Sequence, residues 1–145
     1  MQTTDLVGAI TAIAYMLLII AVFALRIAGQ QDIGRWVGFA STIVLFPLVY
    51  LLAAAFHTHR PAIYFVWLGL MILFALFELI VDLILRVDIR SAQSSVILYV
   101  MFFFAATGGM IGVASQAGRP WAAVTGITFL AMAALAFISR RLTGI

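Results

Sequence analysis

The chain of 145 residues contains no cysteine and no lysine, and only 9% of its residues are charged. The absence of cysteine excludes disulfides, thiol catalysis and cysteine-ligated metal clusters. The absence of lysine excludes a Schiff base to retinal or pyridoxal groups, because that bond needs a lysine amine. Hydrophobic residues make up 66% of the sequence, and its mean hydropathy is +1.24. This composition excludes a water-soluble globule and indicates a polytopic membrane protein.

Five apolar stretches are long enough to cross a bilayer, since a spanning helix needs about 20 mostly apolar residues. They run roughly from Leu6 to Leu25, Val37 to Phe56, Ala62 to Leu85, Val96 to Ser115 and Trp121 to Ile138. The connections are short and leave no room for a soluble domain. The sequence therefore predicts an all-α fold, a bundle of five transmembrane helices with short loops, in which residues 1–145 form a single domain. No basic segment precedes the first stretch, so we expect it to remain as a helix rather than to be cleaved as a signal peptide.

The eight arginines lie near the ends of these stretches and are divided unequally between the two sides. Two of them, Arg60 and Arg119, fall on the same side as Asp5, and six fall on the other side: Arg26, Arg35, Arg86, Arg90, Arg140 and Arg141. The positive-inside rule places the side with six arginines in the cytoplasm. We therefore expect an integral protein of the prokaryotic plasma membrane, with its N-terminus outside and its C-terminus in the cytoplasm. The arginines form no extended cluster, so the pI near 10.0 indicates anchoring in the lipid bilayer, and no nucleic-acid partner is expected.

Two carboxylates, Glu78 and Asp82, lie four residues apart inside the third apolar stretch. A carboxylate at bilayer depth costs roughly 2.5 to 3.5 kcal/mol on insertion scales, so it normally faces protein, water or a partner charge. Residues at steps of three and four place one helical face of this stretch toward the bundle. That face also carries Tyr64, Trp67, Met71 and Ala75. A purely structural alternative is that Asp82 pairs with Arg86 while Glu78 hydrogen-bonds to a neighbouring helix.

The fourth predicted helix runs antiparallel to the third and brings Tyr99 to a depth between those of Asp82 and Glu78. The Tyr99 hydroxyl can donate a hydrogen bond to either carboxylate. An alternative is that Tyr99 belongs to the belt of aromatic residues at the membrane interface. A protonatable acid at depth suits coupling to a proton or cation. We therefore expect a site that binds a ligand, an ion or a proton, formed by Glu78, Asp82, Tyr99, Trp67 and Tyr64.

Small residues in the fourth predicted helix form a stripe that includes Gly108 and Gly112. Such spacing lets another helix approach closely, and Gly8 in the first stretch can act in the same way. The sequence leaves open whether the approaching helix belongs to the same chain or to another copy. In the second stretch, Pro47 removes one backbone hydrogen bond and predicts a kink or local opening. That opening could serve gating or ligand coordination, or be satisfied by neighbouring helices.

The only histidines, His57 and His59, lie in a predicted turn with a spacing that could direct both rings toward Zn²⁺ or Cu²⁺. A metal site here needs a third ligand, for which Asp5 is the candidate on the same side. The alternative is that both histidines are solvated. Neither lies deep in a helix, so we expect no haem ligation and no cofactor. The chain also carries no nucleophile elbow and no cluster of histidines with carboxylates, so whether it is an enzyme is uncertain, with a non-enzyme favoured.

These features favour a small integral membrane protein that binds or transports a proton, a small cation or a lipophilic molecule at an intramembrane acidic site on the third helix. The alternative is a non-catalytic accessory or assembly subunit of a larger membrane complex. In that case Glu78 would meet a basic group of another protein. Both hypotheses imply the lipid bilayer as a partner, together with further copies of the chain or a partner membrane protein. No motif in the chain is specific enough to assign it to a family.

Overall fold

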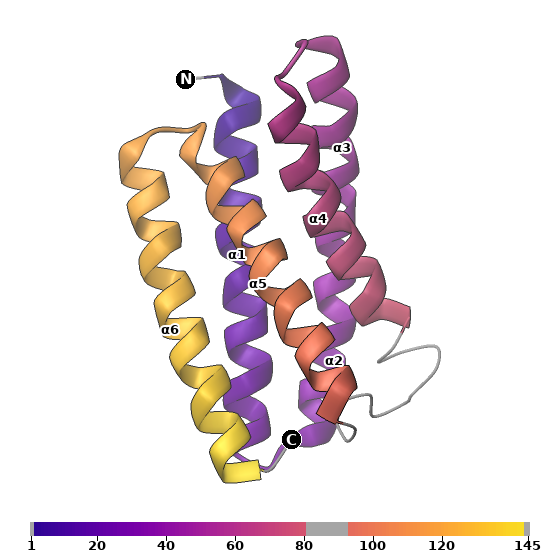
Figure 1. Cartoon of the computed structure of the whole chain (residues 1–145), viewed down its shortest axis with the longest axis vertical. Coiled ribbons are helices and arrows are strands. Elements are labelled where there is room, and N and C mark those ends of the chain that lie inside the picture. Colours follow the sequence, from indigo (N-terminus) through magenta and orange to yellow (C-terminus); the bar gives the residue numbers. More distant parts are fainter. Residues whose placement is uncertain (1, 81–92, 144–145) are drawn as a thin grey trace.

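The computed structural model describes residues 2–80 and 93–143 of the chain, and within these ranges the fold is entirely helical. The helices are α1 (Thr3–Ile27), α2 (Gln31–Ser41), α3 (Leu45–His57), α4 (Ala62–Glu78), α5 (Gln93–Ser115) and α6 (Arg119–Thr143). A short 3₁₀ turn, η1 (Thr42–Val44), joins α2 to α3 without a break, so the two form one long helix. Counted in this way, the described residues form a bundle of five helices (Figure 1), which confirms the all-α prediction.

Four helices in the described ranges are long and apolar enough to cross a membrane: Thr3–Ile27, Asp32–His57, Ile97–Ser115 and Arg119–Leu142. Helix α4 is equally apolar but has 17 residues. At a rise of 1.5 Å per residue it is about 25 Å long, which is shorter than the hydrocarbon core of about 30 Å. The predicted third stretch, Ala62 to Leu85, continues beyond it into residues that lie outside the described ranges.

Helix α1 is the centre of the bundle and packs against α2, α3, α5 and α6. Its buried positions recur at steps of three and four, and many are small: Gly8, Ala9, Thr11, Ala12, Tyr15, Met16 and Ile19. Helix α4 packs between α3 and α5, and α6 covers α1 and α5. The bundle interior is therefore formed by the faces that these helices turn toward α1 and toward one another.

The two ends of the bundle carry different charges. The N-terminus, the α3–α4 turn and the α5–α6 turn lie at one end, at the top of Figure 1, and we call this the Asp5 end. The α1–α2 turn and the end of α6 lie at the opposite end, at the bottom. Arg60 and Arg119 lie at the Asp5 end, whereas the other end holds the remaining described arginines, Arg26, Arg35, Arg140 and Arg141. We call the latter the arginine-rich end.

The predicted local opening at Pro47 takes the form of the 3₁₀ turn one helical turn before it. Pro47 has no N–H to donate to the carbonyl of Ile43, which lies in η1. In this turn the backbone forms 3₁₀ hydrogen bonds, which span three residues instead of four. These bonds give partners to some of the backbone groups near the proline. Two hydroxyls bond to backbone carbonyls just before this turn: Ser41 Oγ donates to the Gly38 carbonyl at 2.5 Å, and Thr42 Oγ1 donates to the Phe39 carbonyl at 2.7 Å.

Close contacts at glycines connect α5 to α4 and to α1. A Cβ atom built at Gly112 would overlap the indole ring of Trp67, and one built at Gly109 would lie 2.8 Å from the Trp67 carbonyl oxygen. On α1, a Cβ atom at Gly8 would lie 2.8 Å from Cγ1 of Val113. Gly108 differs, because no atom lies within 4 Å of its Cβ position. Within the described part of the chain, the close approach of a neighbouring helix therefore occurs at the adjacent Gly109 and not at Gly108.

Candidate functional site

Glu78, the last residue of α4, lies between two tyrosines from two other helices. The hydroxyl of Tyr99 in α5 donates to Oε1 of Glu78 at 3.1 Å. The hydroxyl of Tyr15 in α1 donates to Oε2 of the same carboxyl group at 3.4 Å. Both distances exceed the usual O–H···O separation of about 2.7 to 2.8 Å, so each oxygen is held loosely. We call these three residues the tyrosine clamp.

The tyrosine clamp lies at the mid-depth of the bundle. Tyr15 is the central residue of the 25 residues of α1, so each end of that helix is about 18 Å away along its axis. Tyr15 is fully buried, while Glu78 and Tyr99 are half-buried. Although Glu78 ends a short helix, its carboxyl group therefore lies far from both ends of the bundle.

Aromatic rings surround the two phenols. The ring of Phe74, one turn before Glu78 and fully buried, lies 6.4 Å from the Tyr15 ring and 6.0 Å from the Tyr99 ring. Phe77 and Phe103 also contact Tyr99, at centroid distances of 6.2 and 6.4 Å. Such surroundings have a low effective dielectric, which strengthens hydrogen bonds to a carboxyl group and raises the cost of leaving it unsatisfied.

The register between α4 and α5 explains why Tyr99 meets Glu78. Glu78 follows Trp67 by 11 residues along α4, and Tyr99 precedes Gly109 by 10 residues along α5. These steps correspond to about 16 Å and about 15 Å along the two antiparallel helices. The close contact of Trp67 with Gly109 therefore brings Tyr99 to the level of Glu78. Immediately after Glu78 the helix widens into a π-helical turn at Leu79 and Ile80, a feature found frequently at functional sites.

The structure brings together only part of the site expected from the sequence. Glu78 and Tyr99 are in contact, whereas Asp82 lies outside the described residues. Trp67 packs on Gly112 instead of approaching Glu78. Tyr64 is buried near the Asp5 end, about 21 Å from Glu78 along α4. A shared helical face extends along the whole helix axis, so two of its residues need not lie close together, and Trp67 and Tyr64 lie apart from the tyrosine clamp.

Tyr15 is the member of the clamp that sequence reasoning missed. It is the one tyrosine in the first apolar stretch, and a buried tyrosine usually finds a hydrogen-bond partner for its hydroxyl. That signal indicates that Tyr15 has a polar partner but does not identify it. Glu78 is 63 positions away, and only the packing of the helices brings the two together.

The predicted metal site at the Asp5 end is not formed. His57 and His59 are both exposed, while the candidate third ligand, Asp5, is buried and accepts a hydrogen bond from Arg60. Among the residues that the structure describes, no three histidine or acidic side chains could together hold a metal ion. The Asp5 carboxylate pairs with Arg60 and not with a histidine.

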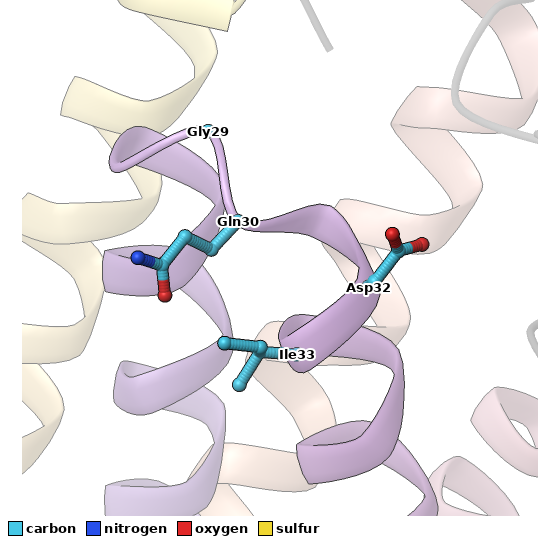
Figure 2. A pocket seen from close by; sticks show the side chains of 4 residues that line it. All are labelled: Gly29, Gln30, Asp32 and Ile33. Atoms are coloured by element: carbon cyan, nitrogen blue, oxygen red, sulfur yellow. The ribbon is translucent and has the colours of Figure 1, made fainter.

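A shallow, open hollow lies at the α1–α2 turn and is lined by Gly29, Gln30, Asp32 and Ile33. Figure 2 shows the Asp32 side chain pointing away from those of Gln30 and Ile33. Its carboxylate lies 3.8 Å from the Arg35 guanidinium, and both side chains are largely exposed to solvent. An exposed pair of this kind contributes little to stability, so the hollow belongs to the polar turn and not to the tyrosine clamp.

The clamp combines one carboxyl group with two hydroxyl groups. A hydroxyl can both donate and accept a hydrogen bond, whereas a carboxyl group donates only when it is protonated. The three side chains can therefore remain hydrogen-bonded with or without a proton on Glu78. No family model, curated protein or solved structure matches the chain.

Proposed function

We propose that the chain is an integral membrane protein in which Glu78 binds and releases a proton within the helix bundle. The observation that carries this proposal is the tyrosine clamp, in which each oxygen of the Glu78 carboxyl group accepts one phenol hydroxyl. The four long apolar helices support a location in the membrane. A carboxyl group at mid-depth in such a bundle is costly and is typically retained for function.

The loose geometry of the clamp suits a group that changes its protonation state. When Glu78 is ionised, both hydroxyls donate to it. When Glu78 is protonated, its own O–H can donate to Tyr99 or Tyr15 after the acceptor hydroxyl rotates. Neither state leaves a buried oxygen without a hydrogen bond, so uptake and release of a proton avoid the penalty of an unsatisfied polar group.

The arginine distribution supports an orientation for this function. The arginine-rich end carries Arg26, Arg35, Arg140 and Arg141, and the positive-inside rule assigns such an end to the cytoplasm. The Asp5 end then faces the opposite side of the membrane. In this orientation the N-terminus is outside, and proton uptake by Glu78 would respond to the pH on a defined side.

A second candidate function, an accessory subunit of a larger complex, is favoured by one observation. Gly108 lies on an exposed part of α5, and its Cβ position has no neighbour within 4 Å. In a membrane such a position allows a helix of another chain to approach closely. A further copy of the chain would use the same surface, so this feature supports either association.

The proposed function is tested by proton flux into vesicles that contain the purified full-length protein and an internal pH-sensitive dye. We expect wild-type protein to dissipate an imposed pH gradient, and Glu78→Gln to reduce this rate to that of protein-free vesicles. Asp32→Asn is the matched control, because it makes the same acid-to-amide change at an exposed position on α2. Equal flux through wild type and folded Glu78→Gln would refute the proposal. Wild-type flux no faster than in empty vesicles would favour the accessory function.

A further inference from the structure

A buried ion pair lies at the Asp5 end of the bundle. The Arg60 guanidinium, in the α3–α4 turn, donates from Nη2 to Oδ1 of Asp5 in α1, and the two side chains are only 14% and 8% exposed. The same Nη2 atom donates to Gln2 Oε1 at 2.8 Å. The guanidinium carbon also lies 5.3 Å from the centre of the Tyr64 ring in α4. One side chain therefore connects α1 with the α3–α4 hairpin through charge, hydrogen bonding and a cation–π contact.

Local structure fixes both partners of this pair. Oδ2 of Asp5 accepts the backbone N–H of Gln2 at 3.1 Å, which orients the carboxylate at the start of α1. The backbone N–H of Arg60 donates to the carbonyl of Ala55 at 3.2 Å and so closes the end of α3. His59, the residue before Arg60, has a left-handed backbone with φ of 48° in the turn between α3 and α4. Because the carboxylate of Asp5 is oriented locally and the backbone of Arg60 is held, pairing costs less entropy than between two flexible residues, which distinguishes this pair from a typical surface ion pair.

A tightly packed apolar layer lies between the ion pair and the tyrosine clamp. Along α1 the distance from Asp5 to Tyr15 is about 15 Å. Over this interval the core residues are fully buried or nearly so: Ala9, Ala12, Leu51, Leu68 and Met71. At Gly8 the packing is tighter still, since an added Cβ atom would lie 2.8 Å from Val113. These apolar side chains offer water no polar partners on the way from the Asp5 end toward Glu78, and Thr11 is the one polar side chain of α1 that is buried between Asp5 and Tyr15.

We propose that the Asp5–Arg60 pair is a latch that holds α1 against the α3–α4 hairpin, so that proton exchange between Glu78 and the Asp5 end is limited by opening of this latch. The effect of the latch on proton exchange rests on the proposed function, whereas the latch itself does not. Removing one member of a buried ion pair leaves the other charge unpaired in an apolar setting, which is strongly unfavourable. The remaining charge regains hydration when the helices separate and water enters at this end.

Single cysteine reporters can test the latch because the chain has no cysteine of its own. Thr11→Cys places a thiol on the buried face of α1, between Asp5 and Tyr15. Ser139→Cys places a thiol at a buried position of α6 near the arginine-rich end. With the protein in vesicles, a water-soluble maleimide should label neither reporter while the latch is intact. In Asp5→Asn and in Arg60→Gln it should label the α1 reporter and still not label the α6 reporter.

Matched variants complete the test. Asp5→Glu and Arg60→Lys retain the charges and should keep the α1 reporter unlabelled, and so should the distant change Asp32→Asn. Absence of labelling at the α1 reporter in both latch variants would overturn the proposal. Labelling at both reporters would also overturn it, because the pair would then support the whole fold and not one end. Adding Glu78→Gln should not alter labelling, so the latch can stand even if the proposed function fails.

Proton flux then tests the route of exchange. If the latch closes the Asp5 end, Asp5→Asn should raise the flux, and the additional flux should disappear when Glu78→Gln is combined with it. If the α1 reporter is labelled but the Glu78-dependent flux does not rise, the latch does not control proton exchange at Glu78. Loss of flux in Glu78→Gln alone tests only the proposed function, so the two failures are distinguishable.

Discussion

The backbone of Trp67 in α4 touches α5 at Gly109, where an added Cβ atom would lie 2.8 Å from the Trp67 carbonyl oxygen. Two antiparallel helices that approach this closely at one level keep a fixed register at the next. The level reached about three turns further along α4 is that of Glu78, and on α5 it is that of Tyr99. The contact between two residues outside the clamp therefore determines which hydroxyl group meets the carboxyl group within it.

Two adjacent glycines of α5 should respond differently to the same substitution. Gly109→Ala inserts a methyl group against backbone that cannot rotate away, so we expect a loss of about 1 to 3 kcal/mol in unfolding free energy. Gly108→Ala places its methyl group in open space and should leave stability unchanged or raise it by up to about 1 kcal/mol, because alanine is the better helix former. Unfolding of the purified protein in mixed micelles measures both. Equal effects at the two positions would contradict the α4–α5 contact.

Removal of either phenol hydroxyl should weaken the clamp. We expect Tyr99→Phe and Tyr15→Phe each to cost about 0.5 to 1.5 kcal/mol, with the larger loss for Tyr99 because its hydrogen bond is shorter. In the Glu78→Gln background, removing either hydroxyl should lower the unfolding free energy by less. A double-mutant cycle therefore measures the coupling between each hydroxyl and the Glu78 carboxyl group. Tyr50→Phe, at an exposed tyrosine, is the control and should have no effect. Full additivity with Glu78→Gln would show that the hydroxyls do not stabilise the carboxyl group.

The features that could be predicted from the sequence are those that depend on residues close to one another along the chain. Apolar length predicted the helices, and the steps of three and four predicted which face of α4 is buried. Tyr64, Met71 and Ala75 lie on that face and are buried, while Leu73 on the opposite face is 57% exposed. The expected partnership of Tyr99 with Glu78 needed only two sequential helices running antiparallel.

The remaining features depend on how distant helices pack, which periodicity does not determine. Nothing in the sequence indicates that α1, rather than another helix, supplies the second phenol through Tyr15. Gly108 and Gly109 point about 100° apart on the helix, and only the position of Trp67 decides that Gly109 is the close contact. Asp5 presented the same difficulty, because its partner depended on a turn that brings Arg60, and not a histidine, against it.

The left-handed residue in the α3–α4 turn provides a further prediction. His59 has φ of 48°, a conformation that costs a non-glycine residue about 1 kcal/mol or more. We therefore expect His59→Gly to leave thermal stability unchanged or to raise it, and His59→Val to lower it, because a branched side chain tolerates this backbone poorly. His57→Gly is the matched contrast, since His57 is helical and its replacement should cost up to about 1 kcal/mol. A lower stability of His59→Gly than of His57→Gly would contradict the turn geometry.

The 3₁₀ turn between α2 and α3 should depend on Pro47. In Pro47→Ala the new backbone N–H can donate to the Ile43 carbonyl, so we expect η1 to convert to regular α-helix and this new amide to exchange slowly with deuterium. Ser41→Ala combined with Thr42→Val retains the proline and removes only the two hydroxyl bonds, so in that variant the 3₁₀ turn should persist. Amide exchange and backbone chemical shifts in micelles distinguish the two variants. Rapid exchange of the new amide would mean that it does not donate to the Ile43 carbonyl. The missing N–H of Pro47 would then not be the cause of the 3₁₀ turn.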